Sequence, residues 1–262
     1  MNQVRIDSVD FTDLDLPETI YKYRVWTNPY HKTIISKKEV FMASPRLFID
    51  PLDCKIPIRY DLLSKKDLFE KYLYESRKDH PKWTREQHRK FARTWMKETA
   101  MSDFSFVKEW QESYFEDFFD RFGVFSLTAN CFNDRMWKVY SDNHKGFCVG
   151  FNTLILFGHL GGGGNVNYVD ELPIIFPSPK HSYEYQHALL VFSKLRKWEY
   201  EQEYRTHKFY KLPPTETERI IQVPASAYKE LILGKNMEPK IKEDLLKSIP
   251  LDLATMTIKD EE

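Results

Sequence analysis

The 262-residue sequence predicts a single α+β domain, because strand-like segments come first, a helical block follows, and strand-like segments then return. Aromatic and β-branched residues bounded by prolines indicate short strands between residues 17 and 60. Residues 61–122 contain no glycine and one proline, and their apolar spacing is helical. We therefore expect one sheet-based domain over residues 1–262, with a helical insertion at about 61–122.

An aromatic stripe runs through the end of the helical block. Every fourth residue is aromatic from Phe106 through Trp110, Tyr114 and Phe118 to Phe122, with Phe115 and Phe119 widening the stripe. Earlier in the block, Thr84–Gln87 reads TREQ, the pattern of a capping box at the start of a helix. Gly123 is expected to end the last helix as its C-terminal cap.

Strand patterns return after residue 123, in VFSLTAN, GFCVGF, NVNYVD, EYRTHKFY, RIIQVP and ELILG. Helices are expected at 181–196 and 238–248. A short helix is also expected in DRMWKVYSD, with Gly146 turning the chain into a strand at 147–151. The run GGGG at 161–164 is expected to be a flexible hairpin loop, since the Lys-Ser/Thr pair of a phosphate-binding P-loop does not follow it.

Composition excludes several classes of protein. Lys plus Arg equals Asp plus Glu at 39 each, so no overall field draws the chain to nucleic acid or to an anionic membrane. Three cysteines without a CxxC pair argue against a disulfide framework or a structural zinc site, and the histidine spacing predicts no metal site. The N-terminus lacks the apolar core of a signal peptide, and no apolar run approaches the ~20 residues that span a bilayer. We expect a cytoplasmic protein without a membrane partner.

Four sequence blocks carry a family resemblance. IYKYR (20–24), FMASPRLFIDPLDC (41–54), FSLTANCFNDRMWKVYSDNHKGFCVGF (125–151) and KWEYEQEYR (197–205) resemble an uncharacterised bacterial family, a domain of unknown function. That family has a Tyr-Lys-Tyr start, an FNDPFD-like turn, an MWxxYxxxHxG block and a WxxExEYR end. Here Ile49 stands where the turn of the family has asparagine, although Asp50 and Asp53 remain.

The layout is more distantly similar to the ADP-ribosyltransferase fold, which includes DNA-modifying bacterial toxins. The resemblance implies a mixed, mainly antiparallel sheet and NAD as the substrate. It also implies a protein or nucleic acid acceptor, a toxin or antiphage role, and a neutralising partner protein. The counterparts of that fold's site residues would be Lys22, Tyr23 and Arg24 on the first strand, Ser44 on the second, and Glu203 late in the chain.

The glutamates of EQEYR suit this chemistry. Cleavage of the nicotinamide–ribose bond develops positive charge on the ribose, which a fixed carboxylate stabilises. Glu201 and Glu203 would share one face of a strand with Arg205, one glutamate holding ribose and the other orienting the acceptor. The alternative is a solvated strand edge with a cross-strand ion pair.

The remaining candidate residues would bind the NAD molecule. Lys22 and Arg24 share a strand face and suit the pyrophosphate, although solvated cations on an amphipathic strand are the alternative. Ser44 either bonds ribose or closes a turn before Pro45. Trp137 or Tyr140 would pack against the nicotinamide ring, and His144 would donate a hydrogen bond to phosphate or ribose. The alternative is that Trp137 belongs to the core and that His144 caps backbone carbonyls.

Two other functions stay open at this point. One is a metal-dependent nuclease that uses Asp50, Asp53, Glu201 and Glu203. The other is a non-catalytic module that docks a partner protein through its aromatic-rich segment, Trp95 to Phe122.

Overall fold

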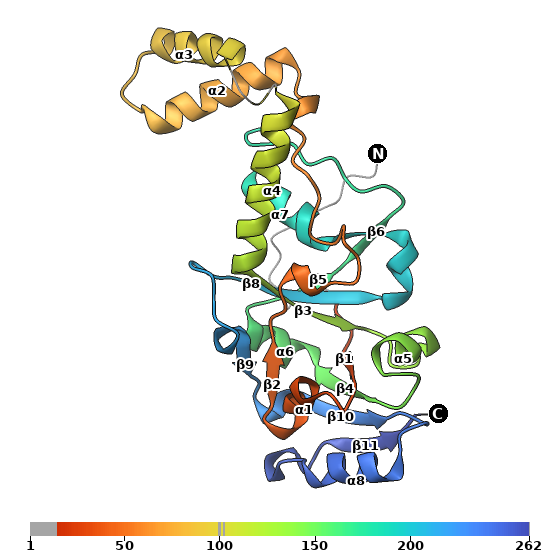
Figure 1. Cartoon of the computed structure of the whole chain (residues 1–262). Helices are drawn as coiled ribbons and strands as arrows, with labels where there is room; N and C mark the ends of the chain where they lie inside the picture. Colours follow the sequence, from red (N-terminus) through yellow and green to blue (C-terminus); the bar gives the residue numbers. More distant parts are fainter. Residues whose placement is uncertain (1–14, 99–100, 102, 262) are drawn as a thin grey trace.

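A seven-stranded sheet forms the centre of the computed structural model, which describes residues 15–98, 101 and 103–261. Its strand order is β11-β10-β4-β1-β3-β8-β5 (Figure 1). Neighbouring strands are antiparallel except β10 and β11, which run parallel. The predicted α+β class with a mainly antiparallel sheet is therefore confirmed. The strands are β1 (Thr19–Arg24), β3 (Phe122–Thr128), β4 (Phe147–Asn152), β5 (Gly164–Asn165), β8 (Glu203–Phe209), β10 (Tyr228–Leu233) and β11 (Thr257–Asp260).

Helices surround this sheet, and two short strand pairs form separate two-stranded sheets. The helices are α1 (Pro29–Ser36), α2 (Lys65–Asp79), α3 (Arg85–Glu98), α4 (Phe104–Arg121), α5 (Asp134–Tyr140), α6 (Thr153–Leu160), α7 (Tyr183–Phe192) and α8 (Pro239–Lys247). The pairs are β2 (Glu39–Phe41) with β9 (Ile220–Gln222), and β6 (Asn167–Val169) with β7 (Ser193–Leu195). The helix expected at 238–248 is present as α8. The helix expected at 181–196 is present as α7 but ends at Phe192, where β7 begins. Within the described residues, no helix combines the length and apolar character needed to cross a membrane.

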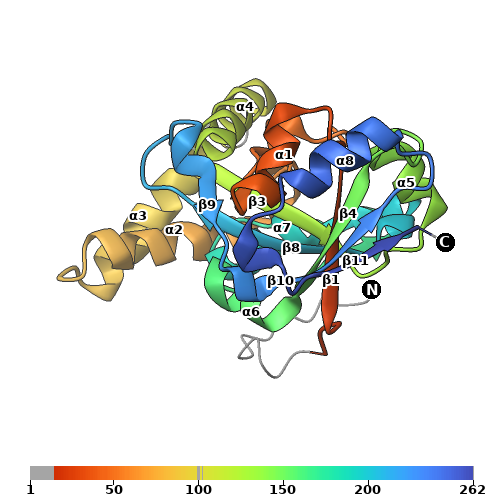
Figure 2. The same cartoon turned by 90° about the horizontal axis from the view of Figure 1, so that it is seen from below.

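The sheet buries both of its faces. Ile20 of β1 and Phe147, Val149 and Phe151 of β4 pack under α1, α6 and α8 in the largest core. The opposite face packs under α5, where Tyr23 of β1 contacts Trp137 edge to face at 5.0 Å between ring centroids. Figure 2 shows α1 and α8 side by side, and Asp244 accepts hydrogen bonds there from Trp26 and Lys32.

Helix α4 joins strand β3 without a connecting loop, because α4 ends at Arg121 and β3 begins at Phe122. Phe115, Phe118 and Phe119 pack with Phe122 in a second core beneath α7. The N-terminal end of the aromatic stripe behaves differently, since Phe106 is 42% exposed. The expected C-terminal cap at Gly123 is wrong, because Gly123 lies inside β3. A Cβ atom at this position would lie 2.7 Å from the Met42 Cβ, so the reason for the glycine is close packing.

Substitution Gly123→Ala tests this packing. The methyl group must displace the end of β2 from β3, so we expect the free energy of unfolding to fall by about 1–3 kcal/mol. Chemical denaturation of the purified proteins measures the difference. Gly164→Ala is the matched control, because a Cβ there meets nothing closer than 3.9 Å. Equal stability of the two variants would contradict the packing argument.

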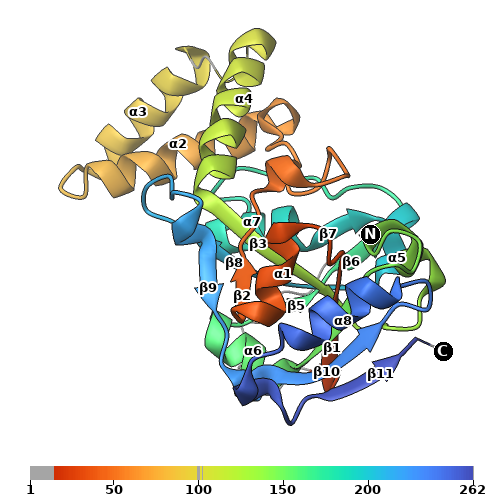
Figure 3. The same cartoon turned by 60° about the horizontal axis from the view of Figure 1, so that its bottom comes forward.

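The expected insertion contains a helical hairpin that stands off the body (Figures 1 and 3). Helices α2 and α3 pack on each other through Tyr72, Leu73 and Ala92, and Ser76 Oγ lies 2.8 Å from His88 Nδ1. The capping box at the start of α3 is confirmed, since the Thr84 and Gln87 side chains each accept from the backbone N–H of the other. The hairpin therefore has its own small core.

The glycine run at 161–164 is not a hairpin loop. Gly161 ends α6 in the left-handed conformation with φ 93°, and Gly164 already belongs to β5. The sequence reading missed α6, whose TLILFGHL is buried through Thr153, Leu156, Phe157 and Leu160. A short apolar run of this kind does not distinguish a buried helix from a buried strand.

Candidate functional site

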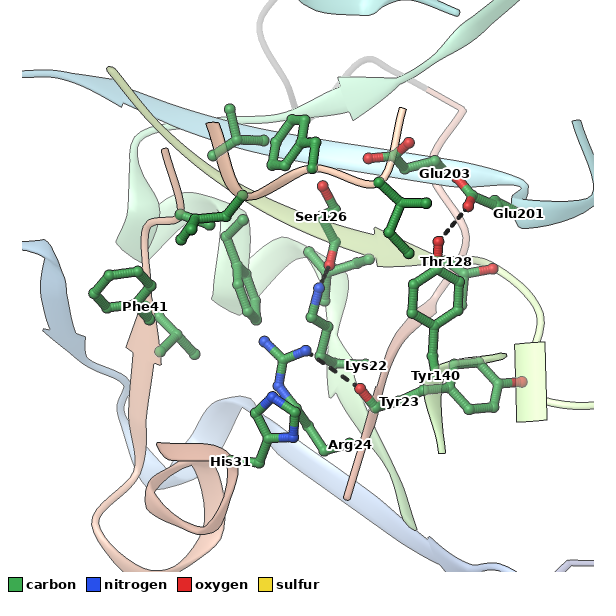
Figure 4. Close-up of a pocket in the computed structure, with 18 of the residues that line it drawn as sticks. Lys22, Tyr23, Arg24, His31, Phe41, Ser126, Thr128, Tyr140, Glu201 and Glu203 are labelled. Carbon is green, nitrogen blue, oxygen red and sulfur yellow. Dashed lines mark hydrogen bonds between the residues drawn. The ribbon is translucent and has the colours of Figure 1, made fainter. Parts of the chain in front are cut away.

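A pocket of about 550 Å³ opens between β1, β3 and the segment that follows β2. Strand β1 contributes Lys22 and Arg24, and β3 contributes Ser126 and Thr128, all of which border the pocket (Figure 4). The volume lies within the range of small-molecule sites, about 300–1,000 Å³. Apolar and aromatic side chains form much of the wall, among them Phe41, Phe48, Phe125 and Trp198.

One end of the pocket is basic. The side chains of Lys22, Arg24 and His31 lie near one another in Figure 4, the first two on β1 and the third on α1. The Arg24 guanidinium makes a long hydrogen bond, 3.4 Å, to the Tyr23 carbonyl oxygen, and no carboxylate of the described residues pairs with it. Burial lowers the Arg24 pKa to about 10, so the side chain stays charged at neutral pH. An unpaired guanidinium facing a pocket is suited to bind an anion.

The neighbours of Arg24 add hydrogen-bond donors to this end. The Lys22 amine donates to the Ser126 carbonyl and lies 5.1 Å from the Phe125 ring centroid; burial and the nearby Arg24 lower its pKa. His31 Nδ1 accepts from the Val25 N–H at 3.2 Å. Burial, Arg24 and Lys22 lower the His31 pKa to about 4, so the ring is neutral at pH 7 and carries its proton on Nε2.

The other end of the pocket carries carboxylates. Glu201 ends a 3₁₀ turn (Arg196–Glu201), Glu203 begins β8, and Gln202 between them is left-handed with φ 43°. Both carboxylates accept from Lys194 Nζ, at 2.6 Å for Glu201 and 2.9 Å for Glu203. The two glutamate side chains therefore lie together as predicted. The left-handed Gln202 between them brings them together, not the side-chain alternation of a continuous strand. The Tyr140 hydroxyl donates to Glu201 at 2.5 Å from across the pocket (Figure 4).

Behind these glutamates lies a buried cluster of charges. Arg205 is fully buried and donates through both terminal nitrogens to Asp53, at 2.8 and 2.5 Å. It also donates to both Glu203 oxygens, at 2.6 and 2.9 Å. Lys194 lies 3.3 Å from Asp53 as well. The alternative of a solvated strand edge is therefore wrong, since each of these side chains is at least nine-tenths buried.

The electrostatics of this charge cluster keep Glu203 ionised. Burial alone would raise the Glu203 pKa, but the charges of Arg205 and Lys194 outweigh it and lower the pKa. The same competition acts on Lys194 with the opposite sign. Burial alone would lower the Lys194 pKa, but the negative charges of Glu203, Asp53 and Glu201 outweigh burial and raise it. Three carboxylates face two cations, which leaves one excess negative charge. Glu201 is the member without a contact to Arg205, and it borders the pocket.

The structure brings some predicted site residues to the pocket and places others elsewhere. Those that border it are Lys22, Tyr23, Arg24, Tyr140, Glu201 and Glu203. The Tyr23 hydroxyl donates to the Asn130 carbonyl at 2.9 Å. Arg205 stands behind the lining and holds Glu203 in place.

Three predicted residues lie outside the pocket lining. Ser44 caps a 3₁₀ turn and donates to the Phe119 carbonyl at 2.8 Å, which is the turn-closing alternative. Trp137 is 1% exposed and donates its indole N–H to the Cys131 carbonyl, so it is core. His144 is buried beside the C-terminal strand, with Nδ1 2.6 Å from Glu261. For these three the ligand-binding interpretation is replaced by a structural one.

His31 and Lys194 were not predicted as site residues, and Asp53 was predicted only as a ligand of the alternative metal-dependent nuclease. As a nuclease ligand, Asp53 would share a metal with Glu201 and Glu203, but the Lys194 ammonium occupies the space between these carboxylates. Among the described residues, no group of three or more His, Cys, Asp or Glu side chains is arranged to hold a metal ion. Asp50 also borders the pocket, with its carboxylate accepting from the Leu52 N–H at 3.3 Å, and no ion pair joins it to the charge cluster among the described residues.

These features make the pocket a candidate small-molecule site with a basic end, a carboxylate end and aromatic walls. Residues 136–206 match a family model described as a protein of unknown function, DUF2971. This match supports the resemblance to an uncharacterised domain-of-unknown-function family over these residues, which include Tyr140, Lys194, Glu201 and Glu203. Comparisons with curated proteins and with solved structures gave no match.

Proposed function

We propose that the protein binds NAD in this pocket, breaks the nicotinamide–ribose bond and passes ADP-ribose to a macromolecular acceptor or to water. The observation that carries the proposal is the opposite charge of the two ends of one pocket. Arg24 is a cation without a carboxylate partner among the described residues, and Glu201 belongs to a charge cluster with one excess negative charge. NAD likewise has an anionic pyrophosphate and a cationic nicotinamide ring.

The basic end fits the pyrophosphate. A guanidinium binds phosphate oxygens through two parallel hydrogen bonds, and such charge-assisted bonds are about twice as strong as neutral ones. Arg24 would supply this contact, with the Nε2–H of neutral His31 as a second donor. The aromatic wall, including Phe41 and Phe48, would pack against the flat rings of the dinucleotide.

The carboxylate end fits the bond that breaks. When the glycosidic C–N bond breaks, its electron pair leaves with nicotinamide, which becomes neutral, and the ribose carbon becomes electron-deficient. The acceptor oxygen or nitrogen then bonds to that carbon and loses its proton to a carboxylate or to water. A fixed negative charge stabilises the intermediate positive charge in a water-poor site.

Glu201 is better placed than Glu203 for this role. Both Glu203 oxygens already accept from Arg205, and one also accepts from Lys194. Among the described residues, each Glu201 oxygen accepts a hydrogen bond from one donor, Tyr140 or Lys194, which leaves a lone pair for a ribose hydroxyl. We therefore assign the ribose contact to Glu201 and a positioning role to Glu203.

Substitution Arg24→Gln tests the binding half of the proposal. Loss of a charged hydrogen-bond donor costs about 1.5–3 kcal/mol, so we expect the affinities for NAD and ADP-ribose to fall roughly 10- to 100-fold. Isothermal titration calorimetry measures both ligands. Folding should be unchanged, because Arg24 forms no ion pair with any described residue that the substitution would remove.

The matched control is Arg196→Gln, which removes an exposed arginine that pairs with Asp170 outside the pocket. It should bind NAD like the unmodified protein. Absence of NAD and ADP-ribose binding by the unmodified protein, or an Arg24→Gln variant with full affinity, would overturn the proposal.

A further inference from the structure

The α2–α3 hairpin concentrates the positive charge of a neutral chain. Residues 65–98 contain eleven Lys and Arg against six Asp and Glu, a net charge of +5, so the rest of the chain carries −5. Ten of the eleven basic side chains are exposed: Lys65, Lys66, Arg77, Lys78, Lys82, Arg85, Arg89, Lys90, Arg93 and Lys97. A basic field is thus confined to the element that stands off the body (Figure 3).

No ion pair among the described residues neutralises these ten charges. The ion pairs of residues 65–98 are Lys71 with Glu75, and Asp67 with Lys180 of the body. Neither uses one of the exposed cations, and across the described part of the chain no other carboxylate pairs with them. The ten exposed cations of the hairpin are therefore available to a partner of opposite charge.

Helix α3 arranges several of these cations in a row. Arg89, Arg93 and Lys97 recur every fourth residue, about 6 Å apart along the axis, and Lys90 lies on the same side of the helix. Like charges four residues apart destabilise a helix by about 0.2–0.5 kcal/mol per pair. The row therefore opposes folding, which points to a partner that carries the opposite charge.

The rest of the hairpin narrows the chemistry of that partner. A membrane-surface helix needs a free apolar face, but α3 uses its apolar face, with Ala92 and His88 buried against α2. Protein–protein interfaces are depleted in lysine at their centres, so a surface rich in exposed lysine does not favour a protein partner. Exposed aromatic rings lie among the cations, with Tyr74 41%, Trp83 37% and Trp95 46% exposed. Cations interspersed with accessible aromatic rings are typical of surfaces that bind single-stranded nucleic acid.

We propose that the α2–α3 hairpin binds single-stranded nucleic acid, with the cations of α3 on the phosphates. The surface is separate from the pocket, since no residue of 65–98 borders it. The inference therefore does not depend on NAD chemistry, and either proposal can fail alone.

The test measures binding of a labelled 20-nucleotide single strand, as DNA and as RNA, by fluorescence anisotropy on the full chain across a salt series. The triple variant Arg89→Gln/Arg93→Gln/Lys97→Gln should bind at least 10-fold more weakly at low salt. Its salt dependence should be shallower, with the slope of log K against log salt reduced by about 2–3. Its melting temperature should not fall, because like charges have been removed.

The control Lys55→Gln/Lys211→Gln/Lys240→Gln removes the same charge from exposed lysines elsewhere, and it should bind like the unmodified protein. A duplex of the same sequence should bind more weakly than the single strand. Equal losses in the two triple variants or a duplex that binds as tightly would overturn the proposal. Binding to anionic lipid vesicles without binding to either oligonucleotide would overturn it as well.

Discussion

Glu201→Gln is expected to lower the rate of nicotinamide release from NAD by about 10²–10³-fold, the usual effect of losing one preorganised electrostatic contact. The variant keeps the shape of the side chain and its bond from Tyr140 but removes the charge opposite the electron-deficient ribose. Folding should be largely retained, because the remaining Asp53 and Glu203 then balance Lys194 and Arg205. Chromatography of released nicotinamide at matched folded concentration gives the rate.

The control for this prediction is Glu199→Gln, two residues earlier, where an exposed carboxylate pairs with Arg196. It should retain the full rate. Calorimetry of NAD binding separates chemistry from affinity, since Glu201→Gln should bind NAD nearly as well as the unmodified protein. Full turnover by Glu201→Gln would refute the assigned role.

Arg205→Met is expected to lower the free energy of unfolding by about 3–5 kcal/mol, because it breaks a buried ion pair and leaves the partner charges uncompensated. Asp53, Glu201 and Glu203 would then face Lys194 alone. Urea denaturation monitored by tryptophan fluorescence measures the loss.

The matched control is Arg46→Met, which removes an exposed arginine paired with Glu116 and Asp120. Surface pairs contribute about 0–1 kcal/mol, so this variant should remain close to the parent. The double variant Arg205→Met/Asp53→Asn should recover part of the stability, since one uncompensated charge is removed. A fully stable Arg205→Met protein would show that burial of the charge cluster has been misjudged.

The sequence predicted the parts of the fold that depend on local pattern. Alternation in IYKYR placed Lys22 and Arg24 on one side of β1 and the tyrosines on the other, as the structure has them. The capping box of TREQ and the helix in DRMWKVYSD were likewise predicted from short-range spacing. Local rules were sufficient wherever one element decides the position of a side chain.

The missed features depend on contacts between distant segments. Asp53 and Arg205 are 152 positions apart, and no spacing rule connects them. Lys194 lies in β7, just before the block KWEYEQEYR at 197–205, and His31 is an isolated histidine on α1. The alternative that placed Glu203 on a solvated strand edge was wrong, because the burial of β8 depends on the segments that cover it. A buried arginine gives no signal of its own in a single sequence.

Because α4 and β3 are joined without a loop, the number of residues between the helix core positions and the strand cannot change without moving one of the two elements. One residue inserted after Arg121 would rotate the preceding helix by about 100° relative to the strand and turn Phe115 and Phe118 away from the core. If the helix kept its position, the insertion would instead shift β3 by one residue and exchange its two faces, which would remove Ser126 and Thr128 from the pocket edge. Insertions should therefore be tolerated in the turn between α2 and α3 but rejected at Arg121–Phe122.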